Sequence, residues 1–364
     1  MIENVTINNY RSFRRLRAEG LTRVNLFVGR NNVGKTSLLD ALDLYVQRAT
    51  PEALWRASDR RRESRYVEGG DAEATGSWHE GVLDLRLLIH GRELKAGVGL
   101  SIEGDDGSLR CTVEKGPNGQ GKTSSSVLSY RAVPELSGHE DGLTIPLAGT
   151  RLAWSLHRFR DFSGNAWTRD DAGADAPVRF LGTFADPVSQ LSADWNSIAL
   201  TDGEDAVVRA LRTLEPEIER IAYLGGGGVS LDPQGFVVTF GKAKTRVPIG
   251  SLGDGIKRIL AVTVNAVTAS GGALFVDEID TGLHHSAMLS MWRSLVSVAH
   301  AQNVQVFATT HSLDCVYALG QLVAEGAETS SAVALHRIER DEERTVRYSG
   351  AEIAAAARSG MEVR

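Results

Sequence analysis

The segment GRNNVGKT at residues 29–36 constrains the fold more than any other feature of the chain. It matches the phosphate-loop pattern G-x-x-x-x-G-K-[ST], in which backbone N–H groups point into one hollow at the amino end of a helix. VNLFV at 24–28 is typical of a buried strand, and apolar residues follow Lys35 at helical spacing. We therefore expect a nucleotide site formed by Gly29, Arg30, Asn31, Asn32, Val33, Gly34, Lys35, Thr36 and Ser37.

A second segment, GPNGQGKT at 116–123, matches the same pattern. It follows a plausible strand, LRCTVEK, but it precedes TSSSVLSYRAV, in which three serines and the alternation of Val127, Ser129 and Arg131 favour a second strand. A phosphate loop without a following helix lacks its structural context. We predict a hairpin loop there and assign nucleotide binding to the earlier match alone.

Composition narrows the class of protein. The chain has 364 residues, 42% of them hydrophobic, and a formal net charge of -6, so we expect a folded globular protein with no general attraction to nucleic acid. Its two cysteines, Cys111 and Cys315, lack the spacing of a zinc site or a disulfide framework. No secretion signal and no apolar run of roughly 20 residues is found, which predicts a cytoplasmic protein without a membrane span.

Two carboxylates close a short apolar run in the last third of the chain, ALFVDE at 273–278. A buried parallel strand delivers such residues to the carboxyl edge of a sheet. Asp277 can hold Mg²⁺ there, and Glu278 can accept a proton from the water that attacks a γ-phosphate. The alternative is a pair of acids that only cap the strand end.

A second strand followed by polar residues, VQVFATTHS at 304–312, places His311 where it can hydrogen-bond a γ-phosphate oxygen. A lone histidine is usually a satisfied surface or core residue, so that alternative stands beside the catalytic one. Upstream, SLGDGIKRILAVTVNAV at 251–267 opens an apolar helix with a glycine-containing turn, which can present N–H groups to a phosphate.

The order of phosphate loop, glycine turn, paired acids and histidine resembles the ABC-type ATPase domain. It is most similar to the group that includes OLD-family proteins, RecF-like repair ATPases and structural maintenance of chromosomes (SMC) proteins. MIENVTINNYRSF followed by GRNNVGKTSLLDAL resembles their opening strand and phosphate loop. LGDGIKR resembles the signature motif, DEIDTGLH the Walker B acids, and TTHS the switch histidine. The resemblance implies an α/β, ABC-type P-loop NTPase with a mixed central sheet, an antiparallel β-lobe and an inserted helical lobe.

The resemblance also implies roles for individual residues. Lys35 contacts the β- and γ-phosphates of ATP, Thr36 and Asp277 hold Mg²⁺, Glu278 polarises water, and His311 completes this half of the site. The signature turn of a second subunit closes the other half, so the resemblance implies an ATP-sandwiched homodimer or higher homo-oligomer. The residues of that turn are Gly253, Asp254 and Gly255.

Two positions depart from the pattern of the relatives. Gly253 stands where many have serine, so a contact to the γ-phosphate must come from backbone N–H or from Ser251. His284 stands where many have aspartate. Two further assignments rest on the resemblance alone: Gln190 as the glutamine that senses Mg²⁺, and Arg11 with Ser12 near the nucleotide.

We divide the chain into 1–185, with phosphate loop and β-lobe, 186–245, a helical lid, and 246–364, with signature, Walker B, switch histidine and a terminal hairpin. Residues 82–150 read as short strands and 186–224 as mainly helical. The terminal hairpin is expected to turn at Asp341 and Glu342.

The arginines of WRASDRRRESRY form either a solvated surface, which we favour, or a nucleic-acid patch. They are Arg56, Arg60, Arg61, Arg62 and Arg65. Only 53 residues follow His311 (364 − 311), too few for the Toprim nuclease domain of OLD-family proteins, so any effector is expected in another chain.

Three hypotheses follow. The first is an ATPase whose ATP-bound dimer switches a separate effector, in the setting of bacterial antiphage defence. The second is a DNA-binding repair ATPase of RecF-like type, for which the arginine cluster is the sequence support. The third is a module that binds ATP without hydrolysing it.

Overall fold

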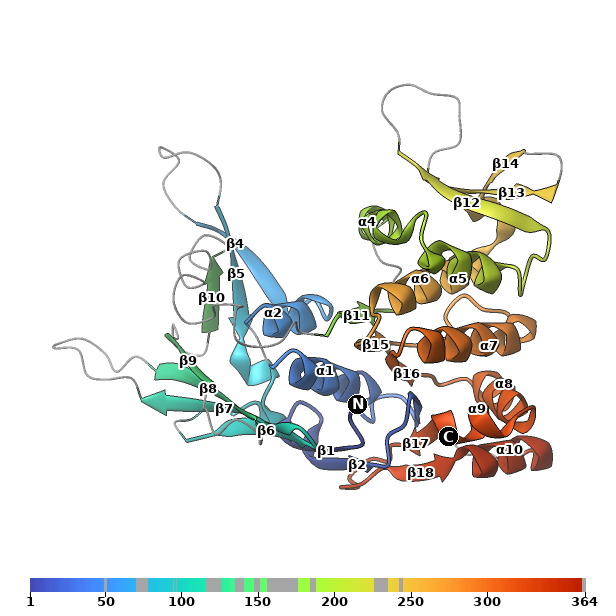
Figure 1. Ribbon diagram of the computed structural model, residues 1–364. Helices are drawn as coiled ribbons and strands as arrows, with labels where there is room; N and C mark the ends of the chain where they lie inside the picture. Colours follow the sequence, from blue (N-terminus) through green and yellow to red (C-terminus); the bar gives the residue numbers. More distant parts are fainter. Residues whose placement is uncertain are drawn as a thin grey trace.

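A six-stranded mixed sheet forms the centre of the computed structural model (Figure 1). Its strand order is β11 (Val178–Leu181), β15 (Ala273–Val276), β16 (Gln305–Thr309), β3 (Val24–Val28), β17 (Val333–Arg337) and β18 (Val346–Ser349). The first five strands run parallel and β18 pairs antiparallel with β17, as the sequence predicted for a mixed sheet. The structure describes residues 1–48, 51–69, 78–93, 95, 97–115, 126–134, 141–146, 151–155, 176–183, 188–225, 235–241 and 245–361.

Each face of this sheet packs against its own hydrophobic core. Along β3, Val24, Leu26 and Val28 belong to one core and Phe27 to the other, because successive side chains of a strand point to opposite faces. On the Phe27 side lies helix α1 (Lys35–Val46), together with the amino-terminal hairpin. The other face is covered by helices α6 (Asp254–Thr268), α7 (His285–Ala301), α8 (Leu313–Ala324) and α10 (Gly350–Ser359), with the short α9 (Ala327–Ala332) beside α8.

The predicted antiparallel β-lobe is present. Its sheet has the order β2 (Phe13–Glu19), β1 (Asn4–Tyr10), β6 (Gly99–Gly104), β7 (Gly107–Lys115), β8 (Ser126–Pro134) and β9 (Asp141–Pro146). Nearby lie α2 (Pro51–Asp59) and a smaller sheet of β10 (Arg151–Ser155), β5 (Trp78–Asp84) and β4 (Ser64–Gly69). The expectation of short strands over residues 82–150 is wrong for the segment that follows β5. Asp84 accepts a hydrogen bond from the N–H of Arg86 and caps the 3₁₀ turn η1 (Leu85–Leu87), which is followed by η2 (His90–Arg92).

The segment expected to form a helical lid, 186–245, is only partly helical. Helices α4 (Val188–Ile198) and α5 (Asp202–Leu211) match the prediction, but the rest of the segment expected to be helical forms β12 (Ile218–Leu224). Pro216 lies between α5 and β12 and cannot continue a helix, and Ile218 and Ile221 are both buried beneath the new sheet. β12 pairs with β13 (Gly235–Phe240), which pairs with β14 (Arg246–Pro248).

The terminal hairpin of β17 and β18 is confirmed, and Asp341 lies in its turn with a φ of 65°. Helix α10 was not expected from the sequence. Ser349 and Glu352 form a capping box at its start, which is the S-x-x-E signal that could have revealed it. Among the described residues, no helix combines the length and apolar character required to cross a bilayer.

Candidate functional site

The loop from Gly29 to Gly34 joins β3 to α1 at the carboxyl edge of the central sheet. Both glycines have positive φ, 146° and 106°. A Cβ atom on Gly34 would come within 2.6 Å of the Phe13 ring, and one on Gly29 within 2.5 Å of the Ile338 carbonyl oxygen. Glycine is therefore required at both positions, because a side chain would clash with these atoms and because L-residues rarely adopt such φ values.

Lys35 begins α1, and its side chain folds back over the loop. Its Nζ donates to the carbonyl oxygens of Gly29 at 2.8 Å and Arg30 at 3.1 Å. Burial lowers the pKa of Lys35 from its ordinary value, although the charges of Asp277, Glu278 and Asp280 act in the opposite direction. The ammonium group thus lies among oxygen acceptors at a helix amino end, an arrangement that suits phosphate oxygens.

Thr36 and Asp277 come together from different elements. The Thr36 hydroxyl donates to both carboxylate oxygens of Asp277, at 3.2 and 3.0 Å. A hydroxyl and a carboxylate oxygen are ligands that Mg²⁺ accepts when phosphate and water supply the rest, so this pair fits the ion. No group of three or more His, Cys, Asp and Glu side chains that could hold a metal occurs in the described part of the chain, and such a group is not needed here.

Glu278 adopts an unusual backbone conformation, with a φ of 46°. Left-handed backbone in a residue other than glycine is uncommon and occurs most often where surrounding contacts hold it. Its carboxylate Oε1 lies 3.8 Å from Nδ1 of His311, and both side chains are partly exposed, at 37% and 53%. The two predicted catalytic groups therefore face each other beside Thr36 and Asp277.

Three residues that the sequence analysis missed hold this arrangement. Thr309 ends β16 and Thr310 follows it, and their hydroxyls donate to Asp277 Oδ1 at 2.6 Å and Asp280 Oδ1 at 2.5 Å, respectively. Arg258 of α6 donates to backbone carbonyls of the Walker B turn. The paired threonines before His311 were a usable signal, because hydroxyls at a strand end reach the neighbouring strand end. Arg258 gave none through these contacts, since the acceptors described here are backbone carbonyls.

The predicted signature turn lies at the surface. Gly253 has a φ of 94° and precedes α6, and no described side chain caps this helix end. Ser251 and Asp254 are exposed, Gly255 is partly exposed, and Lys257 contacts Asp254 at 2.5 Å. His284 accepts from the N–H of Ser286 and caps α7, with its ring 4.0 Å from that of His285.

Arg11 and Ser12 lie at the turn between β1 and β2, close to α1. Arg11 Nη1 donates to both carboxylate oxygens of Glu63 at 2.8 Å. The Ser12 hydroxyl lies 3.2 Å from that of Ser37. Ser12 is thus next to the phosphate loop while Arg11 is held by a carboxylate, and the contact of either with nucleotide stays a prediction.

Gln190 lies in the first turn of α4, where its amide donates to Asp194 at 3.3 and 3.4 Å. Its assignment to Mg²⁺ stays a prediction. The end of β11 approaches the Walker B turn through the backbone: the Asp277 N–H donates to the Leu181 carbonyl, and the next carbonyl, of Gly182, accepts from Arg258.

The arginine cluster after α2 is neither a uniformly solvated surface nor a free basic patch. Arg60 Nη2 lies 2.6 Å from Asp43 and 3.1 Å from Asp40, and Arg61 Nε lies 2.6 Å from Asp40. Both aspartates are buried side chains of α1, and the Arg60 guanidinium also covers the Phe180 ring at 3.7 Å. The expected surface role is wrong for Arg60 and Arg61 and fits the exposed Arg56 and Arg62. The side chain of Arg65 lies outside the described residues.

Comparison with known families matches residues 24–314 to the family described as "AAA domain, putative AbiEii toxin, Type IV TA system". The matched range covers most of the chain and includes the phosphate loop, both Walker B acids and His311. The chain belongs to this AAA-domain family. The predicted resemblance to P-loop ATPases of the AAA family is confirmed, and this AAA-domain protein is an ATPase.

Individual relatives are distant. An ATP/GTP phosphatase of Helicobacter pylori is 20% identical over 361 residues, with 89% of each chain covered. An uncharacterized protein of Methanocaldococcus jannaschii, MJECL10, is 44% identical over 46 residues, which are 13% of this chain and 21% of that one. Two solved structures are similar over 96% of this chain: an SMC head domain from Thermotoga maritima (14% identity, 98% of that chain, TM-score 0.43) and an SmcHead bound to the C-winged helix domain of ScpA (11%, 97%, 0.46).

The second phosphate-loop match of this AAA-domain protein, 116–123, lies outside the described residues. Its flanking strands, β7 and β8, pair antiparallel with Lys115 opposite Ser126. The element that begins at Ser126 is therefore a strand, as predicted.

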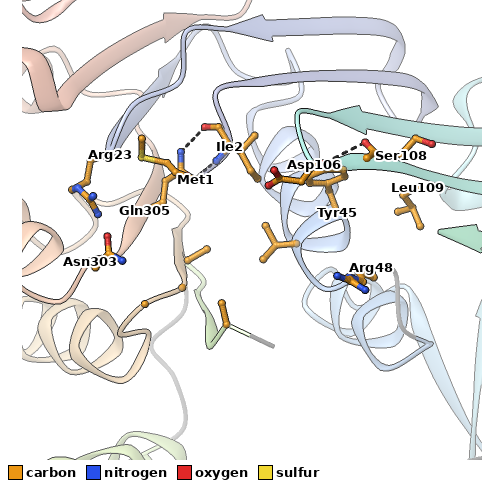
Figure 2. Close-up of a pocket in the computed structure, with 16 residues that line it drawn as sticks. Met1, Ile2, Arg23, Tyr45, Arg48, Asp106, Ser108, Leu109, Asn303 and Gln305 are labelled. Atoms are coloured by element: carbon orange, nitrogen blue, oxygen red, sulfur yellow. Dashed lines mark hydrogen bonds between the residues drawn. The ribbon is translucent and has the colours of Figure 1, made fainter. Parts of the chain in front are cut away.

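A cavity of about 310 Å³ lies at the opposite end of the sheet from the phosphate loop (Figure 2). Arg23, Gly272 and Gln305, at the amino ends of β3, β15 and β16, line it together with Tyr45 and Asp106. The loop, the acids and His311 all follow the carboxyl ends of those same strands. The cavity is therefore separate from the site of ATP chemistry.

Proposed function

We propose that this protein is a Mg²⁺-dependent ATPase whose ATP-bound homodimer acts as a conformational switch for a separate effector protein. The observation that carries the proposal is the meeting of Lys35, Thr36, Asp277 and Glu278 at one edge of the sheet, with His311 3.8 Å from Glu278. Residues from three separate parts of the sequence supply a complete set for phosphoryl transfer to water.

Each residue of the set has a distinct task. Lys35 exchanges its loop carbonyls for β- and γ-phosphate oxygens, and Thr36 and Asp277 hold Mg²⁺. The bound ion neutralises charge that develops on the phosphates. Glu278 orients the attacking water and accepts its proton as the bond to the γ-phosphorus forms and ADP departs. His311 donates a hydrogen bond to the γ-phosphate beside it.

The other half of the site comes from a second subunit in this proposal. The turn at 253–255 is exposed, and its helix amino end has no side-chain cap among the described residues. Such an end offers N–H groups and the positive end of a helix dipole to an anion. Its glycine in place of serine makes backbone N–H groups, with Ser251 nearby, the contacts across the dimer.

The setting that we propose is bacterial antiphage defence, in the cytoplasm, with the effector supplied by another chain. The family description, which names a toxin of a toxin–antitoxin system, supports this setting. The RecF-like alternative loses support, because Arg60 and Arg61 are engaged by Asp40 and Asp43. We retain 1–185, 186–245 and 246–364 as proposed units, with 186–245 as a lobe of helices and strands.

Three substitutions test the proposal by turnover, ATP binding and oligomeric state. Lys35→Ala is expected to abolish ATP binding, whereas its matched control at the second motif, Lys122→Ala, leaves binding intact. Glu278→Gln is expected to stop turnover and to stabilise an ATP-dependent dimer. An inactive wild-type protein, together with a Glu278→Gln protein of unchanged oligomeric state, would overturn the proposal in favour of a module that only binds ATP.

A further inference from the structure

One guanidinium group donates hydrogen bonds to the backbone carbonyls that follow two neighbouring strands of the central sheet. Arg258 is buried, with 7% of its surface exposed, and lies in the helix that packs on β11 and β15. It donates to the carbonyl oxygen of Gly182 after β11 at 3.2 Å. After β15 it donates to those of Asp277 at 3.0 Å, Glu278 at 2.9 Å and Ile279 at 3.5 Å.

These contacts fix both peptide groups that flank the Cα atom of Glu278. The carbonyls of Asp277 and Glu278 accept from Arg258. On the opposite side of the same two peptide groups, the Glu278 N–H donates to Thr309 Oγ1 at 2.8 Å and the Ile279 N–H to the Thr309 carbonyl at 2.9 Å. Each peptide group is thus held at both ends, and together they set the φ of 46° at Glu278.

A glutamate keeps a left-handed backbone conformation only when surrounding contacts hold it. The conformation costs roughly 1–2 kcal/mol in an L-residue other than glycine, so it relaxes when the contacts that hold it are removed. The Cα–Cβ bond turns with the backbone. Loss of the contacts from either Arg258 or Thr309 would therefore turn the Glu278 carboxylate away from His311 and leave the phosphate loop unchanged.

We propose that Arg258 is a positioning residue: its guanidinium fork holds Glu278 in the left-handed conformation that aims the carboxylate at the attacking water. The inference rests on the proposed ATPase function. It assigns to Arg258 a role in turnover that is separate from ATP binding, because none of its carbonyl partners given above belongs to the loop at 29–36.

The fork is a property of arginine. Its planar guanidinium presents several N–H groups in fixed directions, whereas lysine presents one compact ammonium. Arg258→Lys therefore keeps the charge and most of the stem but cannot satisfy the same set of carbonyls. Arg179→Lys is the matched control: Arg179 contacts Thr268 at the far end of the same helix and Asp194 of α4. A general loosening of α6 would show in both variants.

The experiment measures ATP turnover at saturating ATP and the dissociation constant of ATP in EDTA. Turnover is divided by the number of ATP-binding sites found by titration, so that unfolded protein does not lower the measured kcat. Because displacement of a catalytic group by about 1 Å costs up to about 100-fold, we expect kcat of Arg258→Lys to fall by about 10- to 100-fold. The ATP dissociation constant should stay within about threefold, and Arg179→Lys should keep both values. Arg258→Gln, with a planar amide, is the second variant should the lysine variant not fold.

A double variant tests whether Arg258 acts through Glu278. Glu278→Gln is expected to stop all but a slow residual turnover. Added to it, Arg258→Lys should lower that residual rate by much less than it lowers turnover in the wild-type protein, because residues that act as a unit are not additive. An unchanged kcat in Arg258→Lys, an equal loss in Arg179→Lys, or full additivity with Glu278→Gln would each overturn the inference while the proposed function stands. A wild-type protein without turnover would remove both.

Discussion

The hydroxyl of Thr309, at the end of β16, lies 2.6 Å from Oδ1 of Asp277, at the end of β15. The same hydroxyl accepts the N–H of Glu278 at 2.8 Å. One side chain on a neighbouring strand therefore orders both Walker B acids, the one assigned to Mg²⁺ and the one assigned to the attacking water. Thr309 is fully buried, so water cannot replace the hydroxyl without a change of packing.

Thr309→Val should lower ATP turnover at least about tenfold, a change of about 1.4 kcal/mol in the activation free energy. Valine keeps the branched shape but leaves the Glu278 N–H without its acceptor, and it removes the shorter of the hydroxyl contacts to Asp277, which keeps only the contacts from Thr36. Thr309→Ser is the control, because it keeps the hydroxyl, and it should retain most of the activity. Equal turnover in the valine variant and the wild-type protein, measured at saturating ATP and Mg²⁺, would contradict this prediction.

The parts of the site that follow from local pattern were predictable from the sequence. The phosphate loop, the acids after β15 and His311 after β16 each combine a strand with a polar residue at its carboxyl end, and parallel strands bring such ends together. The contact of Thr309 with Asp277 could have been inferred from the paired threonines, but the contacts of Arg258 with the backbone around Glu278 were not predictable, because every residue carries a backbone carbonyl. When a guanidinium donates to backbone carbonyls, no acidic residue in the sequence marks the position of its acceptors.

The same limit explains the errors in the fold. Arg60 and Arg61 look solvated in a charged run, but their partners, Asp40 and Asp43, sit about 20 residues earlier in a helix whose amphipathic pattern gives no reason to bury acids. Residues 218–224 were expected to be helical as part of 186–224, but they form β12, whose backbone pairs with β13, a contact that lies outside the local sequence.

ATP affinity should fall on the alkaline side at a lower pH than an ordinary lysine would give. Burial lowers the pKa of Lys35, so the free protein loses this proton below the ordinary value of 10.5, whereas a bound triphosphate favours the charged form. Binding above the lowered pKa therefore requires proton uptake. Calorimetry of ATP binding at pH 9, in two buffers of different ionisation enthalpy, measures that uptake directly.

Lys35→Arg is the control for this pH dependence, because a guanidinium stays protonated over the whole range. Whatever its affinity, it should show no proton uptake linked to position 35. A wild-type affinity that stays constant up to pH 10, or an arginine variant that loses affinity in parallel, would show that Lys35 is not the titrating group.

His336 should make the folded protein sensitive to acid. Burial, with the nearby charge of Arg347, lowers its pKa from 6.5 to about 3, and its ring packs against Phe27. Nδ1 lies 3.2 Å from the Thr345 hydroxyl, and no described group hydrogen-bonds Nε2. Between these two pKa values, His336 is therefore protonated in the unfolded chain and neutral in the folded protein. Stability is full above pH 6.5 and is lost as the pH falls towards the folded value.

The expected loss from His336 is about 1.4 kcal/mol per pH unit, or about 2 kcal/mol between pH 6.5 and 5. Urea unfolding of the wild-type protein and His336→Gln at both pH values measures it, since only the change with pH is compared. His300→Gln, at an exposed position, should keep the wild-type pH dependence. A His336→Gln protein that loses as much stability as the wild type over this range would assign the acid sensitivity to other groups.

Arg60→Ala should destabilise the fold strongly and leave DNA binding unchanged. The substitution leaves Asp43, which is 0% exposed, without its arginine, whereas Asp40, which is 1% exposed, keeps Arg61. Removing one partner of a buried ion pair costs about 3–5 kcal/mol. Burial already raises the pKa of Asp43, so it will take up a proton more readily once Arg60 is gone. The loss of stability should therefore be larger at pH 8 than at pH 5, which chemical denaturation at both values would reveal.

Arg56→Ala is the matched control for Arg60→Ala, because Arg56 is exposed and donates only to the Gln47 side chain among the contacts that the structure gives it. Its stability should change by less than about 0.5 kcal/mol. Titration of duplex DNA at several salt concentrations then separates the two readings of the cluster. If the arginines bound phosphates, each alanine variant would reduce the dependence of affinity on salt, and Arg56→Ala would do so without any loss of stability. Because Arg60 and Arg61 are committed to α1, we expect no such change in the exposed variant, and a reduced salt dependence there would restore the DNA-binding alternative.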